Sequence, residues 1–211
     1  MMQIRCDRFE LAESLGDILG IVPAIQPMKP ILVNCHLKTA GGRLEVAVTD
    51  LDMGARVRLE RVEVSGEGEL ALPATRFYSI IREIPEKHVL IEALPDGLGA
   101  IIRTEAYEFK ILGQDAREFP EVPGLSSEPA LSIAREKFVE MLRRVAVAAS
   151  RDTARYQLTG VFLEVQGEKL LLTATDGKRL THDHLRIDNE KGIEASAIVP
   201  NRVCDVILKL L

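Results

Sequence analysis

An internal duplication constrains this chain more than any other feature of its sequence. Residues 169–180 begin as an apolar run suited to a buried strand and then reach the Asp176-Gly177 pair, which tolerates the backbone of a tight turn. Residues 44–52 repeat the apolar run and its Thr-Asp ending, and Asp50 and Asp176 are 126 positions apart (176 − 50). One Asp-Gly turn is a weak signal. Its recurrence at a long offset predicts two copies of one domain, not a solenoid of short repeats.

The two copies align over more than this hairpin. Further segments match at nearly the same offset: residues 32–37 with 158–163, and residues 70–73 with 197–200. At the second of these offsets, which is 127 (200 − 73), Leu211 corresponds to Ile84. The counterparts of residues 85–123, which hold three strand-like runs in the first copy, are therefore missing. We expect a second domain that is cut short.

The composition indicates a soluble globular protein and argues against several other classes. Hydrophobic residues make up 46% of the chain and charged residues 28%. Neither an apolar run of about 18 residues nor a basic-then-apolar leader occurs, so we expect a cytoplasmic protein without a membrane partner. The three cysteines are far apart and odd in number, which argues against a disulfide framework. The net charge of −5 is the wrong sign for holding nucleic acid by overall attraction, so such a role must rest on local patches or on topology.

The order of strand-like and helix-like runs predicts an α+β fold with antiparallel sheets, built from duplicated β-α-β-β-β units. Asp7 can cap a first helix whose apolar side would hold Phe9, Leu15 and Ile18. Residues 31–48 read as two strands and residues 53–64 as one further alternating run. Pro73 is placed as the first residue of a second helix.

Proline and glycine gather between residues 113 and 130, which indicates that the chain leaves its first domain there. We place domain 1 at residues 1–122, a linker at residues 123–130 and the incomplete domain 2 at residues 131–211.

A third helix is predicted over residues 135–149. Its core side would include Phe138 and Leu142, while Lys137, Arg144 and Arg151 recur every seven residues on the other side. At 3.6 residues per turn, this spacing forms one nearly straight basic row. A solvated helix face explains most rows of this kind, so the row alone does not identify a partner.

Several motifs together resemble the family of bacterial DNA polymerase III β subunits, the sliding clamps. They lie in order over nearly the whole chain: residues 29–34, residues 49–53, Phe119-Pro120, residues 155–160 and residues 174–180. The resemblance implies a DNA clamp fold with antiparallel sheets outside and helices on the DNA side. It implies three domains per chain and a head-to-tail homodimer that encircles double-stranded DNA and holds the replicative polymerase on it. It also implies a non-catalytic accessory subunit without a cofactor or a metal.

The resemblance also implies DNA-contacting residues and a dimer interface. The basic row falls on a helix similar to those that line the hole, and a family loop that touches DNA matches the segment around Arg155. The DNA contacts implied in this way are Lys29, Lys137, Arg144, Arg151, Arg155 and Tyr156. Gln26 stands where some members carry a DNA-contacting arginine, which leaves Lys29 as the nearest cation. Phe109 and Ile111 match positions that pack against the partner's third domain, and without that partner their strand would be an open sheet edge.

A pocket for short linear peptides is the second site that the resemblance implies. Its second-domain wall would consist of Leu158, Thr175, Gly177, Lys178, Arg179 and Leu180. The leucines would supply apolar area, Thr175 and the turn backbone would offer hydrogen bonds, and Arg179 would hold a polar group. The implied partners are the polymerase III catalytic subunit, the clamp loader, and other polymerases and repair proteins. The rest of the pocket would lie beyond Leu211.

Three other interpretations of the sequence remain open. Asp50, Asp52 and Asp176 could be metal-binding carboxylates of a nuclease, although their places at equivalent turns in separate domains favour a role in turn formation. His182 and His184 could share a strand face as metal ligands, but no third ligand is near. A clamp-like module or decoy that does not encircle DNA is the third alternative, and the oligomeric state would distinguish it.

Overall fold

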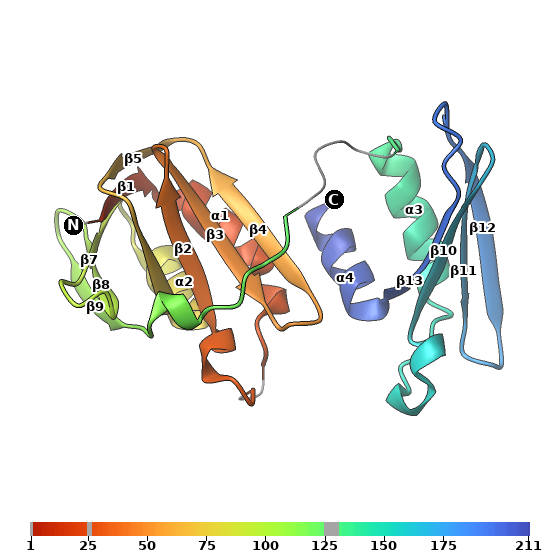
Figure 1. The fold of residues 1–211 in the computed structure, drawn as a ribbon, viewed down its shortest axis with the longest axis horizontal. Coiled ribbons are helices and arrows are strands. Elements are labelled where there is room, and N and C mark those ends of the chain that lie inside the picture. The colour runs from red at the N-terminus through yellow and green to blue at the C-terminus, as the bar shows by residue number, and fades with distance from the viewer. Residues whose placement is uncertain (1, 25–26, 125–130) are drawn as a thin grey trace. The chain divides into compact units, whose positions relative to one another are not determined.

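The structure is a computed structural model that describes residues 2–24, 27–124 and 131–211. Its contacts divide the chain into two compact units after Gly124. The first unit combines two antiparallel sheets, and the second unit one, with a pair of helices, which confirms the predicted α+β class (Figure 1). None of the helices in the described residues is long and apolar enough to cross a membrane.

The first unit contains two sheets and two helices. One sheet has the order β5-β1-β7-β8-β9 and the other the order β4-β3-β2-β6, and every strand pair is antiparallel. The elements are β1 (Gln3–Asp7), α1 (Arg8–Ile18), β2 (Asn34–Ala40), β3 (Arg43–Thr49), β4 (Gly54–Leu59), β5 (Val62–Ser65), β6 (Gly68–Pro73), α2 (Ala74–Glu83), β7 (His88–Ala93), β8 (Gly99–Arg103) and β9 (Glu108–Leu112). Short 3-10 helices are η1 (Leu19–Ile21), η2 (Pro30–Val33) and η3 (Ala116–Glu118).

The second unit repeats the second of these sheets. Its strand order, β12-β11-β10-β13, matches β4-β3-β2-β6 strand for strand, which confirms the duplication. Two helices, α3 and α4, pack on this sheet (Figure 1). The elements are α3 (Arg135–Ala146), the 3-10 segment η4 (Thr153–Leu158), β10 (Gly160–Gln166), β11 (Lys169–Thr175), β12 (Leu180–Arg186), β13 (Ala195–Pro200) and α4 (Asn201–Leu210).

Each unit buries its own core between helices and sheet. In the first unit, α1 packs against α2, and the fully buried side chains include Leu11, Leu15, Phe77 and Ile81. In the second unit, α3 contributes Met141, Leu142 and Val145, which cluster with leucines of β11. All three cysteines are free and buried, and burial raises the pKa of Cys6 and Cys35 to about 12 and that of Cys204 to about 11. They are inert core thiols at neutral pH.

The start of α1 follows one prediction and departs from another. The Asp7 carboxylate accepts hydrogen bonds from the amides of Phe9 (2.8 Å) and Glu10 (3.4 Å), which confirms the predicted cap. The predicted core position of Phe9 is wrong, because its side chain is 56% exposed and lies under the Arg8 guanidinium, 3.5 Å from the ring centre. Leu11 takes the core position instead.

Three predicted boundaries also shift. Residues 53–64 form two strands, β4 and β5, which separate at Glu60 and enter different sheets. Residues 30–33 form η2, so the strand predicted to begin at Ile31 begins at Asn34. The third helix ends at Ala146, three residues before its predicted end.

Residues 113–122 resemble a linker in composition but belong to the first unit. The segment, which we call the strap, crosses the sheet β6-β2-β3-β4 (Figure 1). The Phe119 ring stacks on His36 of β2 with a centroid distance of 5.0 Å and an interplanar angle of 14°. At the far edge, the Arg56 guanidinium donates a hydrogen bond to the carbonyl of Val122. The strap therefore fixes the outer face of this sheet, and we keep residue 122 as the proposed end of domain 1.

Candidate functional site

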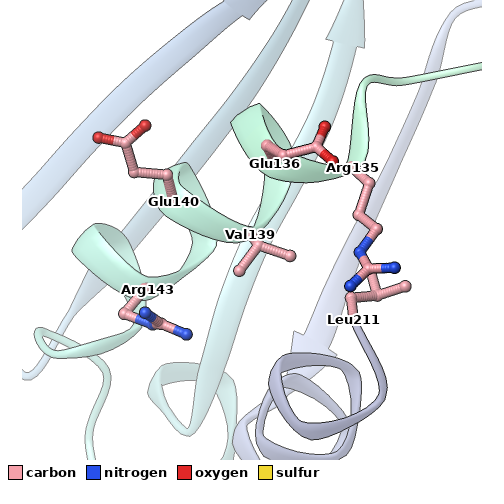
Figure 2. Close-up of a pocket in the computed structure, with 6 residues that line it drawn as sticks. All are labelled: Arg135, Glu136, Val139, Glu140, Arg143 and Leu211. Carbon is pink, nitrogen blue, oxygen red and sulfur yellow. The ribbon is translucent and has the colours of Figure 1, made fainter.

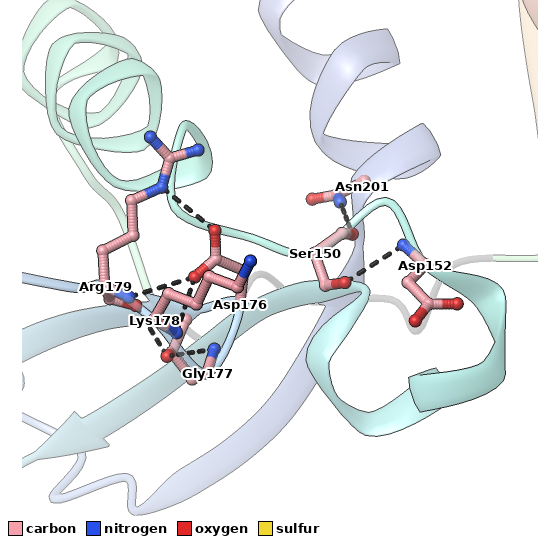
Figure 3. Close-up of polar contacts among 8 residues, drawn as sticks. Ser150, Asp152, Asp176, Gly177, Lys178, Arg179 and Asn201 are labelled. Atoms are coloured by element: carbon pink, nitrogen blue, oxygen red, sulfur yellow. Dashed lines mark hydrogen bonds and ion pairs between the residues drawn. The ribbon is translucent and has the colours of Figure 1, made fainter.

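The turn between β11 and β12 carries most of the predicted peptide-binding wall, and its shape is fixed by hydrogen bonds within the turn (Figure 3). The Thr175 hydroxyl donates to the carbonyl of Arg179 (2.7 Å) and accepts from the amide of Gly177 (3.1 Å). The Asp176 carboxylate accepts from the amides of Lys178 (2.9 Å) and Arg179 (3.0 Å). These four bonds hold the six residues from Thr175 to Leu180 in one conformation before any ligand arrives.

The turn between β3 and β4 repeats this arrangement bond for bond. The Thr49 hydroxyl donates to the carbonyl of Met53 (2.7 Å) and accepts from the amide of Leu51 (3.0 Å). The Asp50 carboxylate accepts from the amides of Asp52 (3.0 Å) and Met53 (2.7 Å). The duplication therefore extends from sequence to turn chemistry, and the Thr-Asp signature has a structural cause in both copies.

The two turns differ in the residue that adopts a positive φ. Gly177 has φ +86° in the second unit, whereas its counterpart Leu51 has φ +81°. A side chain at such an angle costs about 1–2 kcal/mol, since Cβ approaches the neighbouring carbonyl. Leu51 therefore carries backbone strain that Gly177 avoids.

We expect Leu51→Gly to raise the free energy of unfolding of the first unit by about 0.5–1 kcal/mol, because relief of this strain exceeds the entropic cost of glycine. Urea denaturation would measure the change. The reciprocal variant Gly177→Ala provides the matched control and should destabilise the second unit. A loss of stability in Leu51→Gly would show that the exposed leucine makes a stabilising contact instead.

The predicted wall exposes a leucine, whereas several of its hydrogen-bond donors are used within the turn. Leu180 is 65% exposed at the start of β12, and Leu158 is half-buried at the end of η4. The amides of Gly177, Lys178 and Arg179 are already bonded within the turn, so they are not open donors for a ligand. The Thr175 hydroxyl donates its proton to the carbonyl of Arg179, so it is not an open donor either. The wall can therefore supply leucine surface and backbone carbonyl acceptors.

Arg179 forms an ion pair within the same turn. Its Nε lies 3.1 Å from the Asp176 carboxylate, which also receives two amides (Figure 3). The Lys178 amide, followed by that of Arg179, lowers the pKa of Asp176, so this carboxylate is charged at neutral pH. A ligand that uses the Arg179 guanidinium must share it with Asp176. Lys178 is exposed.

The basic residues of α3 do not form the predicted straight row. Because α3 ends at Ala146, Arg151 lies beyond the helix, in the loop that follows it. Lys137 is exposed on the helix, and so is Arg143, a cation that the seven-residue spacing missed. Figure 2 shows Arg143 and Arg135 with Glu136 and Glu140 around a groove that Leu211 also lines. This surface has mixed charge.

Arg144 has a structural role that the sequence did not reveal. Its guanidinium lies 2.6 Å from Glu140 in α3 and 2.8 Å from Asp183 in β12. The hydrogen bond to Asp183 raises the pKa of Arg144, and the same bond lowers the pKa of Asp183. The side chain thus links α3 to β12, with two carboxylates already offsetting its charge. A phosphate would have to compete with both of them.

The loop between α3 and β10 carries the other predicted DNA contacts. Ser150 closes it, because its amide donates to the carbonyl of Leu158 (2.8 Å) and its carbonyl accepts from the Asn201 side chain (2.9 Å). Figure 3 shows Asn201 and Asp152 on either side of Ser150. Arg155 is exposed at the break between two 3-10 turns of η4. The side chain of Tyr156 lies outside the described part of the chain, and so does Gln26.

The remaining predicted site residues lie in the first unit. Lys29 is exposed immediately before η2. The strand β9 pairs with β8 alone among the described strands, so it is a sheet edge. Phe109 is half-buried and stacks on Tyr107 with a centroid distance of 6.1 Å, whereas Ile111 is buried in the unit's own core. The backbone edge of β9 is therefore more available to a partner than the Ile111 side chain.

The carboxylates considered for a nuclease have other partners. Asp50 and Asp176 accept amides in turns of different units. Within residues 2–24, 27–124 and 131–211, no group of three His, Cys, Asp or Glu side chains is arranged to hold a metal ion. His182 bonds Thr173 across the strand pair at 2.8 Å. Turn formation and strand pairing account for these residues.

The duplicated sheet with its helix pair and its braced turn defines a DNA-clamp fold. Comparisons with known proteins agree: residues 2–123 match the N-terminal domain of the DNA polymerase III beta subunit, and residues 132–211 match the central domain. The chain belongs to the DNA polymerase III beta subunit family, which confirms the resemblance. Two similar solved structures are the sliding clamp of Bacillus subtilis (TM-score 0.94, 26% identity, 100% of this chain and 57% of that chain) and the beta subunit of Thermotoga maritima (TM-score 0.88, 25% identity, 100% and 56%).

Curated relatives carry the name beta sliding clamp. The protein of Chlamydia pneumoniae is 28% identical over 99% of this chain and 56% of its own length. The protein of Escherichia coli K12 is 27% identical over 100% of this chain and 57% of its own length. The chain thus spans about half the length of the curated relatives that it matches.

Proposed function

We propose that the protein containing this chain is a sliding clamp, which encircles duplex DNA as a head-to-tail ring dimer and tethers the replicative polymerase. The match of both units, in order, to the N-terminal and central domains of DNA polymerase III beta subunits carries this proposal. A ring also accounts for the net charge of −5, because a topological link requires only weak local contacts with phosphate. The clamp is a cytoplasmic accessory subunit that acts by retention and not by catalysis.

The DNA contacts that we propose are the exposed cations of α3 and of the loop that follows it. Lys137 and Arg143 lie on the helix, and Arg151 and Arg155 lie in the loop. Lys29 is the candidate in the first unit. Such contacts to phosphate give affinity without sequence preference, as sliding requires. Arg144 contributes mainly by holding α3 on the sheet, since Glu140 and Asp183 already bind it.

The turn from Thr175 to Leu180 is proposed as one wall of a docking pocket for linear peptides. Its preformed backbone lowers the entropic cost of binding, and Leu180 offers apolar area that a peptide can cover. The partners are the polymerase III catalytic subunit, the clamp loader, and other polymerases and repair proteins with clamp-binding peptides. The edge strand β9, with Phe109, is proposed as part of the homodimer interface.

We expect Lys137→Ala in the full-length protein to lower the salt dependence of DNA binding by about 0.9 in the slope of log K against log salt, because one phosphate contact is lost. Fluorescence anisotropy with a labelled duplex over a salt series would measure it. Arg186→Ala is the matched control, since Arg186 is an exposed cation of β12 that pairs with Glu168. Equal losses in both variants would contradict a local DNA face. A full-length protein that stays monomeric and fails to remain on circular DNA would favour the non-encircling module.

A further inference from the structure

We propose that Arg155 couples DNA binding to peptide binding, because one guanidinium lies both on the DNA-contacting loop and against the turn of the peptide wall. This inference rests on the proposed clamp function and concerns the regulation of its docking site.

The contact between loop and turn occurs at Gly177. A Cβ atom at position 177 would lie 3.1 Å from Nη1 of Arg155, so the guanidinium occupies the space that a side chain would need. Gly177 sits at the centre of the turn, directly before Lys178 and Arg179, whose amides donate to the Asp176 carboxylate. Any movement of Arg155 therefore changes what covers the middle of the peptide wall.

The loop that carries Arg155 is connected to the wall in a second way. The bond from the Ser150 amide to the Leu158 carbonyl closes the loop at its base, and Leu158 is itself a predicted wall residue. The Asn201 amide bonds Thr159, and its side chain bonds Ser150, so α4 anchors both ends of the loop. The ends of the loop are therefore held by hydrogen bonds, and Arg155 lies between them.

The charge of Arg155 favours a shift toward DNA. Arg179 is paired with Asp176, and Arg144 is paired with Glu140 and Asp183. Among the ion pairs of the described residues, none joins Arg155 to a carboxylate. A phosphate therefore has no fixed anion to displace at this side chain, and a charge-assisted bond to phosphate is stronger than packing over a glycine.

The direction of the coupling follows from this geometry. A phosphate that draws the guanidinium away uncovers Gly177 and enlarges the surface on which a peptide can lie. DNA inside the ring should therefore increase peptide affinity, by about fivefold, the lower end of typical couplings. By linkage, bound peptide should increase DNA affinity by the same factor.

The test uses the full-length protein and a fluorescein-labelled peptide that carries the clamp-binding segment of the polymerase III catalytic subunit. Peptide affinity is measured with and without a short linear duplex. We expect the ratio of peptide affinity with duplex to peptide affinity without duplex to be about five for the wild type and one for Arg155→Ala. Arg155→Lys keeps the charge but loses the planar group over Gly177, so it should bind DNA with a ratio close to one.

Arg151→Ala is the matched control, because Arg151 is an exposed arginine of the same region that is absent from the contacts at Gly177. This variant should bind DNA more weakly. At saturating duplex, its ratio of peptide affinities with and without DNA should equal that of the wild type. A wild-type ratio of one, with both ligands bound, overturns the coupling while leaving the clamp function intact. An unchanged ratio in a folded Arg155→Ala variant overturns the assignment to Arg155. A wild type that binds neither ligand overturns the proposed function and this inference with it.

Discussion

Gly113→Ala should destabilise the first unit by about 3 kcal/mol, at the upper end of the usual cost of overpacking. A Cβ atom at position 113 would lie 2.0 Å from the carbonyl oxygen of Ala71 in β6. Neither backbone can retreat freely. The Gly113 amide donates to Leu98 (2.9 Å), and the Gln114 amide donates to the same Ala71 carbonyl (3.0 Å). Relief of the clash must therefore break hydrogen bonds that hold the start of the strap on its sheet.

Gly20→Ala is the matched control for this substitution. Apart from its own neighbours along the chain, no described residue lies within 4 Å of a Cβ at position 20, so we expect a change within about 0.5 kcal/mol. Urea denaturation would measure both variants, and hydrogen exchange would show where protection is lost. Gly113→Ala should lose protection first in the strap and β6. Equal stability of the two variants would mean that the strap is not held as the structure describes.

Local chemistry explains why the duplicated hairpins could be predicted. The Thr-Asp signature and the positive-φ turn are set by residues within five positions of one another, so the sequence displays them directly. The cap at Asp7 is local in the same way. The register of the sheets follows, since each turn joins two strands whose apolar residues alternate.

Contacts between distant residues explain what could not be predicted. The strap has the composition of a linker, and it belongs to the first unit through contacts with distant residues, such as the stack of Phe119 on His36 and the bond from Arg56 to Val122. Arg144 resembles a solvated cation because its partner Asp183 lies 39 positions away in the chain. Arg143 was not predicted, because a spacing of seven residues selects a single line along a helix, whereas the exposed face is wider.

The candidate site shows the same division. The segment from Thr175 to Leu180 was identifiable from its motif, but the use of its amides within the turn was not. A motif states which donors exist, and only the structure states which are already satisfied. Binding at this wall must therefore depend on apolar contact more than on amide hydrogen bonds.

Leu180→Ala in the full-length protein should weaken the binding of a clamp-binding peptide about tenfold or more. Leu180 is 65% exposed in the chain, so a docked peptide can bury most of a leucine side chain there. Complete burial of a leucine contributes about 1.5–3 kcal/mol, and 1.4 kcal/mol corresponds to a factor of ten in affinity. Arg179→Ala should have a smaller effect, because Asp176 already holds its guanidinium. Fluorescence anisotropy with the labelled polymerase peptide would measure both changes.

Leu51→Ala is the matched control for the loss of exposed leucine. Leu51 is 56% exposed on the equivalent turn of the first unit, where the counterpart of Leu180 is Gly54. A Cβ at Gly54 would lie 2.8 Å from Val122 of the strap, so the chain's own segment already covers that position. Peptide affinity should therefore be unchanged in Leu51→Ala. Full peptide affinity in Leu180→Ala, or an equal loss of affinity in both variants, would contradict a peptide wall in the second unit. In either case, peptide affinity would not depend on Leu180, the exposed leucine that begins β12.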